Sequence, residues 1–137
     1  MSLPFHYIDL RTFAYETEDE QRVEKALRSL LPDEFGIERE ETTGHNGDRI
    51  IVFSTRVENA DDMRYVLNKL REQVDVDQIK HELSDRVDEN CSMFLSFDKQ
   101  QAYDGNILLG DGIAFRAKVE AYPAKQESAI ENAKEAL

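Results

Sequence analysis

Basic and aromatic side chains alternate with apolar ones over residues 113–122, and this spacing could place cations together on one side of a strand. From Ile113 the odd positions are apolar, whereas Arg116, Lys118, Glu120 and Tyr122 occupy even positions. Successive side chains of a β-strand point to opposite faces, so these four would share an exposed face while the apolar ones enter the core. Such a face can bind backbone phosphates and stack on bases. The alternative is a solvated strand face whose charges form cross-strand ion pairs.

Other polar residues could join this surface if their strands pair nearby. Arg49 and Arg56 lie on one expected strand, Lys99 follows another, and His45 lies in a glycine-flanked turn that can present its ring outward. For His45 the alternative is a plain turn residue. The candidate nucleic-acid contacts are therefore His45, Arg49, Lys99, Arg116, Lys118 and Tyr122. We expect the cations to meet phosphates and the two rings to stack or hydrogen-bond.

No local arrangement of residues in the sequence indicates catalysis or metal binding. Cys91 is the only cysteine, which excludes an intrachain disulfide and a multi-cysteine metal site. His6, His45 and His81 lack the helical pairing and the cysteine neighbours of zinc sites. Acidic pairs such as Asp61-Asp62 lie at expected helix starts, where they favour the positive end of the helix dipole. We therefore expect no catalytic residue, no metal and no cofactor.

The candidate residues depend on strands that alternation or apolar enrichment predicts. The expected strands cover residues 5–16, 37–43, 49–57, 92–98, 106–109 and 113–122. Glycine-rich turns at 44–47 and 110–112 predict two hairpins, and the second is the clearer one because glycine supplies the positive φ of a tight turn.

Apolar residues at helical spacing predict the remaining elements. Thr17 and Glu20 form a capping box before a first stripe that runs over residues 23–31. Asn59 caps a second helix, a short third helix covers residues 76–87, and a closing helix covers residues 125–137. This order is not the strict alternation of a doubly wound fold. It predicts a single α+β domain over residues 1–137, with a mixed, mostly antiparallel sheet and helices mainly on one face.

The chain is strongly acidic, with 29 acidic and 17 basic residues and a formal net charge of −12. The carboxylates are spread along the whole sequence, a pattern typical of salt-adapted proteins; an ordinary acidic cytosolic protein is the alternative. Negative charge opposes nucleic-acid binding in dilute buffer. At 1 M salt, however, the Debye length falls to about 3 Å. Distant carboxylates then no longer repel a phosphate, while arginines in contact with it still form hydrogen bonds. Charge alone therefore does not exclude a nucleic-acid ligand.

The remaining composition bears on the compartment. The 40% apolar and 34% charged content lies outside the range of disordered chains. No apolar run approaches the ~20 residues of a membrane span, and residues 1–9 lack the features of a signal peptide. We therefore expect a cytoplasmic protein that does not contact a membrane.

Three segments also resemble those of an archaeal family of RNA-binding proteins or predicted exosome subunits. They are residues 44–50 (GHNGDRI), residues 96–102 (SFDKQQA) with Gly105 soon after, and residues 119–123 (VEAYP). The opening segment over residues 5–18 fits as well, so the resemblance spans nearly the whole chain. It implies an α+β fold similar to that of the ribosomal protein that binds 5S rRNA, with helices against one side of a curved sheet. It assigns no RNA-contacting residue.

The leading hypothesis is a non-catalytic RNA-binding protein that serves RNA processing, with the exosome as a candidate partner. The first alternative is a protein-interaction module whose open sheet face or edge strand docks a partner or a second copy of the chain. The second alternative is a small enzyme whose site is assembled only in space, with Cys91 or a histidine beside carboxylates in a deep pocket.

Overall fold

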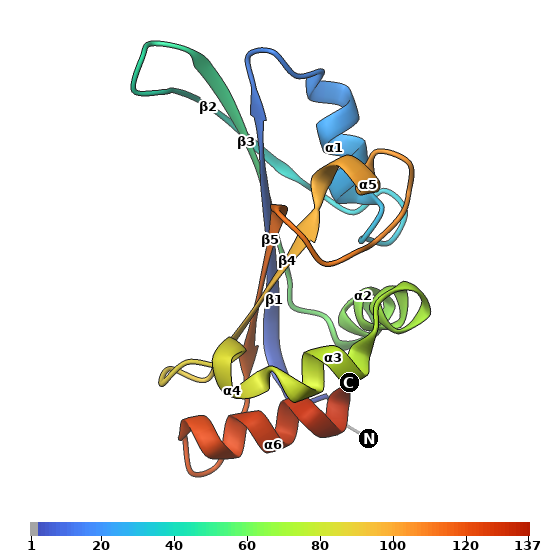
Figure 1. Cartoon of the computed structure of the whole chain (residues 1–137), viewed down its shortest axis with the longest axis vertical. Coiled ribbons are helices and arrows are strands. Elements are labelled where there is room, and N and C mark those ends of the chain that lie inside the picture. Colours follow the sequence, from blue (N-terminus) through green and yellow to red (C-terminus); the bar gives the residue numbers. More distant parts are fainter. Residues whose placement is uncertain (1–2) are drawn as a thin grey trace.

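An antiparallel sheet of five strands runs through the computed structural model, which describes residues 3–137 (Figure 1). The strands lie in the order β2-β3-β1-β5-β4, and each neighbouring pair is antiparallel. Their bounds are β1 Phe5–Tyr15, β2 Glu38–Thr43, β3 Arg49–Val57, β4 Ser92–Asp98 and β5 Gly112–Val119. The longest strand, β1, is therefore the middle one, and β2 and β4 are the edges.

The helices gather on one side and at one end of the sheet. Figure 1 shows α1, α2 and α5 beside the strands, with α3, α4 and α6 grouped near the lower end. Their bounds are α1 Glu20–Arg28, α2 Ala60–Gln73, α3 Val76–His81, α4 Leu83–Arg86, α5 Lys99–Ala102 and α6 Gln126–Ala136. This arrangement confirms the expected α+β class. Among the described residues, no helix is both long and apolar enough to cross a bilayer.

The hydrophobic core fills the space between the helices and one face of the sheet. Strand residues Ile8, Leu10 and Phe115 are at most 1% exposed, as are Leu27 of α1 and Leu70 of α2. Burying a side chain of this size contributes roughly 1.5–3 kcal/mol, so this face fixes how the strands are oriented. Because neighbouring residues on a strand point to opposite sides, the same packing directs the alternate residues away from the core.

Most predicted strand and helix bounds are confirmed to within a few residues, and β3 and β4 begin and end as expected. The start of α1 differs, because Asp19 and not Thr17 is the N-cap and accepts from the backbone N–H of Gln21 at 3.0 Å. The helix also ends at Arg28, before Leu30 and Leu31, which are still buried in the following turns.

The expected strand over residues 106–109 was wrong, and with it the hairpin at 110–112. The Ile107 N–H donates to the Gln73 side chain of α2, and Ile107 itself is 1% exposed. A backbone group used by a helix side chain cannot extend a strand ladder, so only a single bridge joins Leu109 to Phe97. The chain after β4 instead forms the short helix α5 and a loop, and then enters β5.

Candidate functional site

One face of the sheet is turned away from the hydrophobic core, and we call it the open face. On β1 it carries Tyr7, Asp9, Arg11, Phe13 and Tyr15, all exposed or partly exposed, while residues 8, 10, 12 and 14 between them are buried. The open face comprises these five with Ile50, Val52, Ser54 and Arg56 of β3, Ala114, Arg116 and Lys118 of β5, and Phe94 and Ser96 of β4.

A broad groove of about 1150 Å³ lies on the open face. Its floor includes the side chains of Arg11, Arg56 and Arg116, which come from three adjacent strands. One wall is formed by the connection from α1 to β2 at residues 35–37. The groove is partly open to solvent and is not an enclosed cavity, so it can admit one part of a larger ligand.

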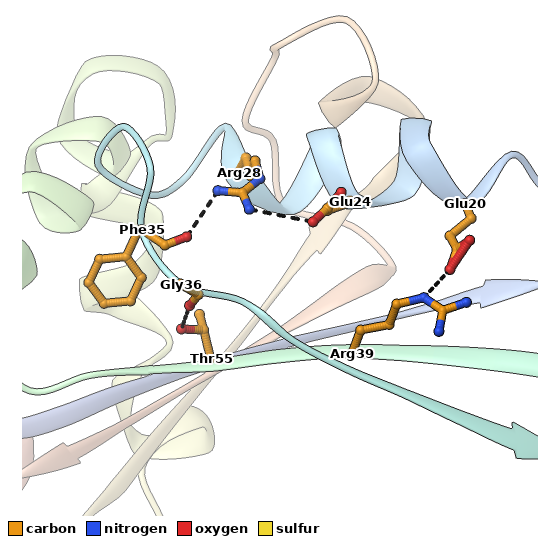
Figure 2. A network of polar contacts seen from close by, with 7 residues as sticks. All are labelled: Glu20, Glu24, Arg28, Phe35, Gly36, Arg39 and Thr55. Carbon is orange, nitrogen blue, oxygen red and sulfur yellow. Dashed lines mark hydrogen bonds and ion pairs between the residues drawn. The ribbon is translucent and has the colours of Figure 1, made fainter.

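Hydrogen bonds hold this wall against the sheet, and Figure 2 shows them from close by. The Arg28 guanidinium donates to the Phe35 carbonyl at 2.9 Å and pairs with Glu24 of α1. The buried Thr55 hydroxyl donates to the Gly36 carbonyl at 2.7 Å. The connection is thus tied both to α1 and to β3, which fixes the wall of the groove in place.

At the centre of the groove, one carboxylate lies between two guanidinium groups. Register places Asp9 opposite both Arg56 of β3 and Arg116 of β5. Asp9 accepts two hydrogen bonds from Arg56, at 2.8 and 2.9 Å, and one from Arg116 at 2.9 Å. Burial by itself would raise the pKa of Asp9. The hydrogen bonds and positive charge of the two arginines outweigh that effect and hold its pKa below the ordinary value.

Each guanidinium retains donors that face the groove. A guanidinium has five N–H groups, and Arg116 uses one of them on Asp9 while Arg56 uses two. Their side chains are 44% and 47% exposed, which leaves these donors accessible to an anionic ligand. The centre of the groove can therefore bind phosphate oxygens without first breaking the ion pairs.

Aromatic rings lie close to these cations. The Arg56 guanidinium lies 3.9 Å from the ring centroid of Tyr7, and that of Arg11 lies 5.5 Å from the ring centroid of Phe13. The rings of Phe13 and Tyr15 are stacked with their centroids 6.5 Å apart. On the edge strand β4, Phe94 is 44% exposed. The open face thus combines cations with exposed ring surfaces that can stack on planar groups.

Apart from Asp9 at the centre, the acidic residues of the groove lie at its rim. Glu38 and Glu40 lie on the edge strand β2, and Glu58 follows the end of β3. These carboxylates would repel a polyanion that crossed β2. The cations are concentrated on β3, β1 and β5, so the favourable side for an anion lies from the middle of the sheet towards β4.

The structure brings together two of the predicted contact residues. Arg116 and Lys118 lie on the open face, while residues 113, 115, 117 and 119 of β5 are buried, which confirms the predicted alternation. Lys118 donates to the Asn90 carbonyl and Arg116 pairs with Asp9. The alternative interpretation, a strand face with cross-strand ion pairs, therefore also describes part of this surface.

The other four predicted contact residues lie elsewhere. Arg49 is on β3 but on the side of the core-facing residues, where it pairs with Glu41 at 3.4 Å. His45 is exposed in the turn between β2 and β3, and Tyr122, beyond the end of β5, is 87% exposed. Lys99 is only 9% exposed, and its ammonium donates to the Phe13 carbonyl at 2.9 Å and to Glu18 at 2.8 Å. It is engaged inside the fold, so we leave it out of the contact surface.

The reasoning from sequence missed the contribution of β1, which is the middle of the open face. Its signal was present, because Tyr7, Asp9, Arg11, Phe13 and Tyr15 alternate with residues that are mostly apolar. Two of the alternate residues are charged and three are aromatic, so the strand was predicted from its aromatic and aliphatic content, without an exposed face. Arg11 is exposed and, within residues 3–137, has no ion pair.

Comparison with known proteins gives consistent matches along the chain. RNA-binding protein PAB1135 of Pyrococcus abyssi is 34% identical over 146 aligned positions, which cover 98% of this chain and 95% of that protein. The crystal structure of protein AF2318 from Archaeglobus fulgidus superposes with a TM-score of 0.87 at 29% identity, covering 97% of this chain and 99% of the other. Mth689, a DUF54 protein from Methanothermobacter thermautotrophicus, gives a TM-score of 0.82 at 38% identity, with coverage of 97% and 98%.

A family model described as RNA binding matches residues 7–119, which include β2 to β5 and β1 from Tyr7 onwards, and hence the whole open face. The extent of this match and the identity to PAB1135 agree with each other. The chain belongs to this RNA-binding family.

Proposed function

We propose that this protein is a non-catalytic RNA-binding protein whose open face is the contact surface. The observation that carries the proposal is that Arg11, Arg56 and Arg116 line one groove. The partly exposed rings of Phe13 and Tyr7 lie beside the guanidinium groups of Arg11 and Arg56. Arginine forms bidentate hydrogen bonds with phosphate and also stacks on planar groups, so it can contact both the phosphates and the bases of RNA.

The proposed contacts divide by chemistry. Arg11, Arg56, Arg116 and Lys118 bind backbone phosphates, and the aromatic rings of β1 and β4 meet bases. His45 and Tyr122 would extend the contact at the periphery, the first in the turn between β2 and β3 and the second beyond β5, whereas Arg49 lies on the opposite side of β3. The name of the Pyrococcus relative supports RNA as the ligand class.

Finer parts of the proposal rest on the sequence. We propose that the chain forms a single domain and that it works in a salt-adapted cytoplasm. The salt adaptation is supported by the carboxylates spread along the chain and by the net charge of −12. An accessory role in RNA processing, with the exosome as partner, rests on the resemblance of the 44–50, 96–102 and 119–123 segments to that archaeal family.

The test compares two double variants with the same change of charge. Arg11→Gln/Arg116→Gln removes two cations from the open face, whereas Lys25→Gln/Lys134→Gln removes two exposed cations from helices α1 and α6. RNA affinity is measured by fluorescence anisotropy over a potassium chloride series. We expect the first variant to bind more weakly, with a salt slope lower by up to about two units. Both variants should unfold within about 0.5 kcal/mol of the parent.

Two outcomes would contradict the proposal. Equal loss of affinity in both double variants would show that only total charge matters and that the open face is not the contact surface. A parent protein that binds no RNA at any salt concentration would favour the protein-interaction alternative, in which the same face docks a protein.

A further inference from the structure

Exposed or partly exposed aromatic rings lie at two separate places on the open face, with cations between them. Phe13 and Tyr15 stack near the end of β1, beside Val52 and Ile50 of β3, which are only partly buried. Phe94 lies on β4, directly opposite Arg116. Two ring surfaces separated by arginines differ from a surface that carries only charge. A ring contributes little binding energy with a phosphate, but it contributes much by stacking on a planar base.

The register gives the distance between the two places. Asp9, Arg116 and Phe94 share one row across β1, β5 and β4, and Tyr15 lies six residues further along β1. With about 3.4 Å per residue along a strand and about 4.8 Å between strands, the two aromatic sites are roughly 22 Å apart. Arg11 and Arg116 lie between them, close to the diagonal that joins the two sites across β1, β5 and β4. The groove includes these two arginines and Phe94.

We propose that the open face binds single-stranded RNA along this diagonal. In the proposal, which rests on the proposed function, unpaired bases stack on the Phe13–Tyr15 pair and on Phe94, while Arg11 and Arg116 bind the phosphates between them. A duplex keeps its bases stacked on one another and offers proteins mainly phosphates and 2′-hydroxyl groups. It would leave these rings unused, and only unpaired bases can stack on both aromatic sites.

The distribution of negative charge supports the same path. Glu38 and Glu40 line the β2 side of the groove, where a backbone would be repelled. On the β4 side the neighbour of Phe94 on the open face is Ser96, which is neutral. A strand of RNA that starts at Phe13 and Tyr15 is therefore directed towards Phe94 and away from β2.

The experiment removes rings while keeping apolar side chains. Tyr15→Leu/Phe94→Leu changes both aromatic sites, and Tyr65→Leu changes a partly exposed ring on helix α2 as the control. The probes are a single-stranded RNA of about 12 nucleotides and the blunt duplex of that RNA with its complement, at the same salt concentration. Fluorescence anisotropy gives both affinities for the parent and each variant.

We expect the parent to bind the single strand at least about tenfold more tightly than the duplex, because base stacking is lost in the duplex. The Tyr15→Leu/Phe94→Leu variant should lose about tenfold or more in affinity for the single strand and leave duplex binding unchanged, whereas Tyr65→Leu should match the parent. If RNA binds but the duplex binds as tightly as the single strand, or if the leucine variant binds both as the parent does, this inference is wrong and the proposed function stands. If the parent protein binds neither RNA, both this inference and the proposed function are wrong.

Discussion

Asp9 is the residue on which the electrostatics of the open face depend. Its carboxylate occupies part of the space between Arg56 and Arg116 and neutralises part of their charge. It also orients both guanidinium groups, since hydrogen bonds from three N–H donors converge on it. A phosphate bound beside Asp9 is helped by the fixed orientation of the two guanidinium groups, but it is repelled by the carboxylate. The repulsion acts over a longer distance than the hydrogen bonds do.

Removing this carboxylate should therefore strengthen RNA binding. Asp9→Asn changes the net charge by one, from −12 to −11, at the centre of the groove. We expect several-fold tighter binding at low salt and a salt slope larger by about one unit. The loss of partly exposed ion pairs should cost only about 1 kcal/mol of stability. Asp61→Asn on α2, which also loses an ion pair with an arginine, is the control. Weaker binding in Asp9→Asn would show that orientation outweighs repulsion.

A second polar cluster lies near the end of β1, and it makes a prediction about pH. Glu18 accepts hydrogen bonds from Lys99 at 2.8 Å and from the Tyr103 hydroxyl at 2.7 Å. Burial and then the hydrogen bond to Glu18 raise the pKa of Tyr103 from 10.0 to about 12. The folded protein thus retains a proton that the unfolded chain loses, so stability falls as pH rises from 10.0 to about 12. In urea unfolding over this range, Tyr103→Phe should show a smaller fall than the parent. An identical fall would contradict the assignment.

At the level of strands and helices, periodicity predicted most of the fold, because alternation and helical stripes report which side of each element is buried. It predicted β3, β4 and the Asn59 cap of α2 well. It failed at residues 106–109, where the partner of the Ile107 N–H is a side chain on α2, far away in sequence. It also failed to place Lys99 in the interior, since its partners Phe13 and Glu18 belong to distant segments. The candidate site was predicted only on β5, because charged and aromatic residues on β1 obscured that strand's alternation.

The entry into β5 depends on a glycine that sequence reasoning assigned to the wrong turn. Gly112 has φ +125°, and a Cβ there would lie 2.4 Å from the Cβ of Lys99. Gly47 in the β2–β3 turn also has a positive φ, +85°, but no atom lies within 4 Å of the same position. Gly47→Ala should cost about 1–2 kcal/mol from backbone strain alone. Gly112→Ala adds a steric overlap and should cost about 3 kcal/mol or more in thermal unfolding. An equal loss of stability in the two variants would show that a small shift of Lys99 removes the overlap at almost no cost.

For the molecule as a whole, the dominant feature is a surplus of carboxylates on the surface. Part of it is concentrated on β2, where Glu38, Glu40 and Glu41 are all exposed on an edge strand. Charged edge strands resist pairing with other chains, so these residues also hinder aggregation. The open face is the exception on this surface, because arginines from three strands meet in its groove.

Salt should therefore stabilise the folded chain. Mutual repulsion of the carboxylates weakens as the Debye length shortens, so the midpoint of thermal unfolding should rise between about 0.1 and 2 M potassium chloride. The triple variant Glu38→Gln/Glu40→Gln/Glu41→Gln removes three of the 29 acidic residues and should show a smaller rise. A parent midpoint that stays flat or falls with salt would contradict the salt-adapted interpretation.

Nuclear magnetic resonance during an RNA titration observes the open face directly. The Nε–H groups of Arg11, Arg56 and Arg116 give side-chain signals from the groove, and Arg22 on α1, whose guanidinium lies over the Tyr103 ring, gives a signal from outside it. If the open face binds RNA, the three groove signals shift with RNA concentration together with the backbone amides of β1, β5 and β4, while the Arg22 signal stays in place. Shifts confined to Arg22 and the helices, with the groove signals unchanged, would contradict RNA binding at the open face.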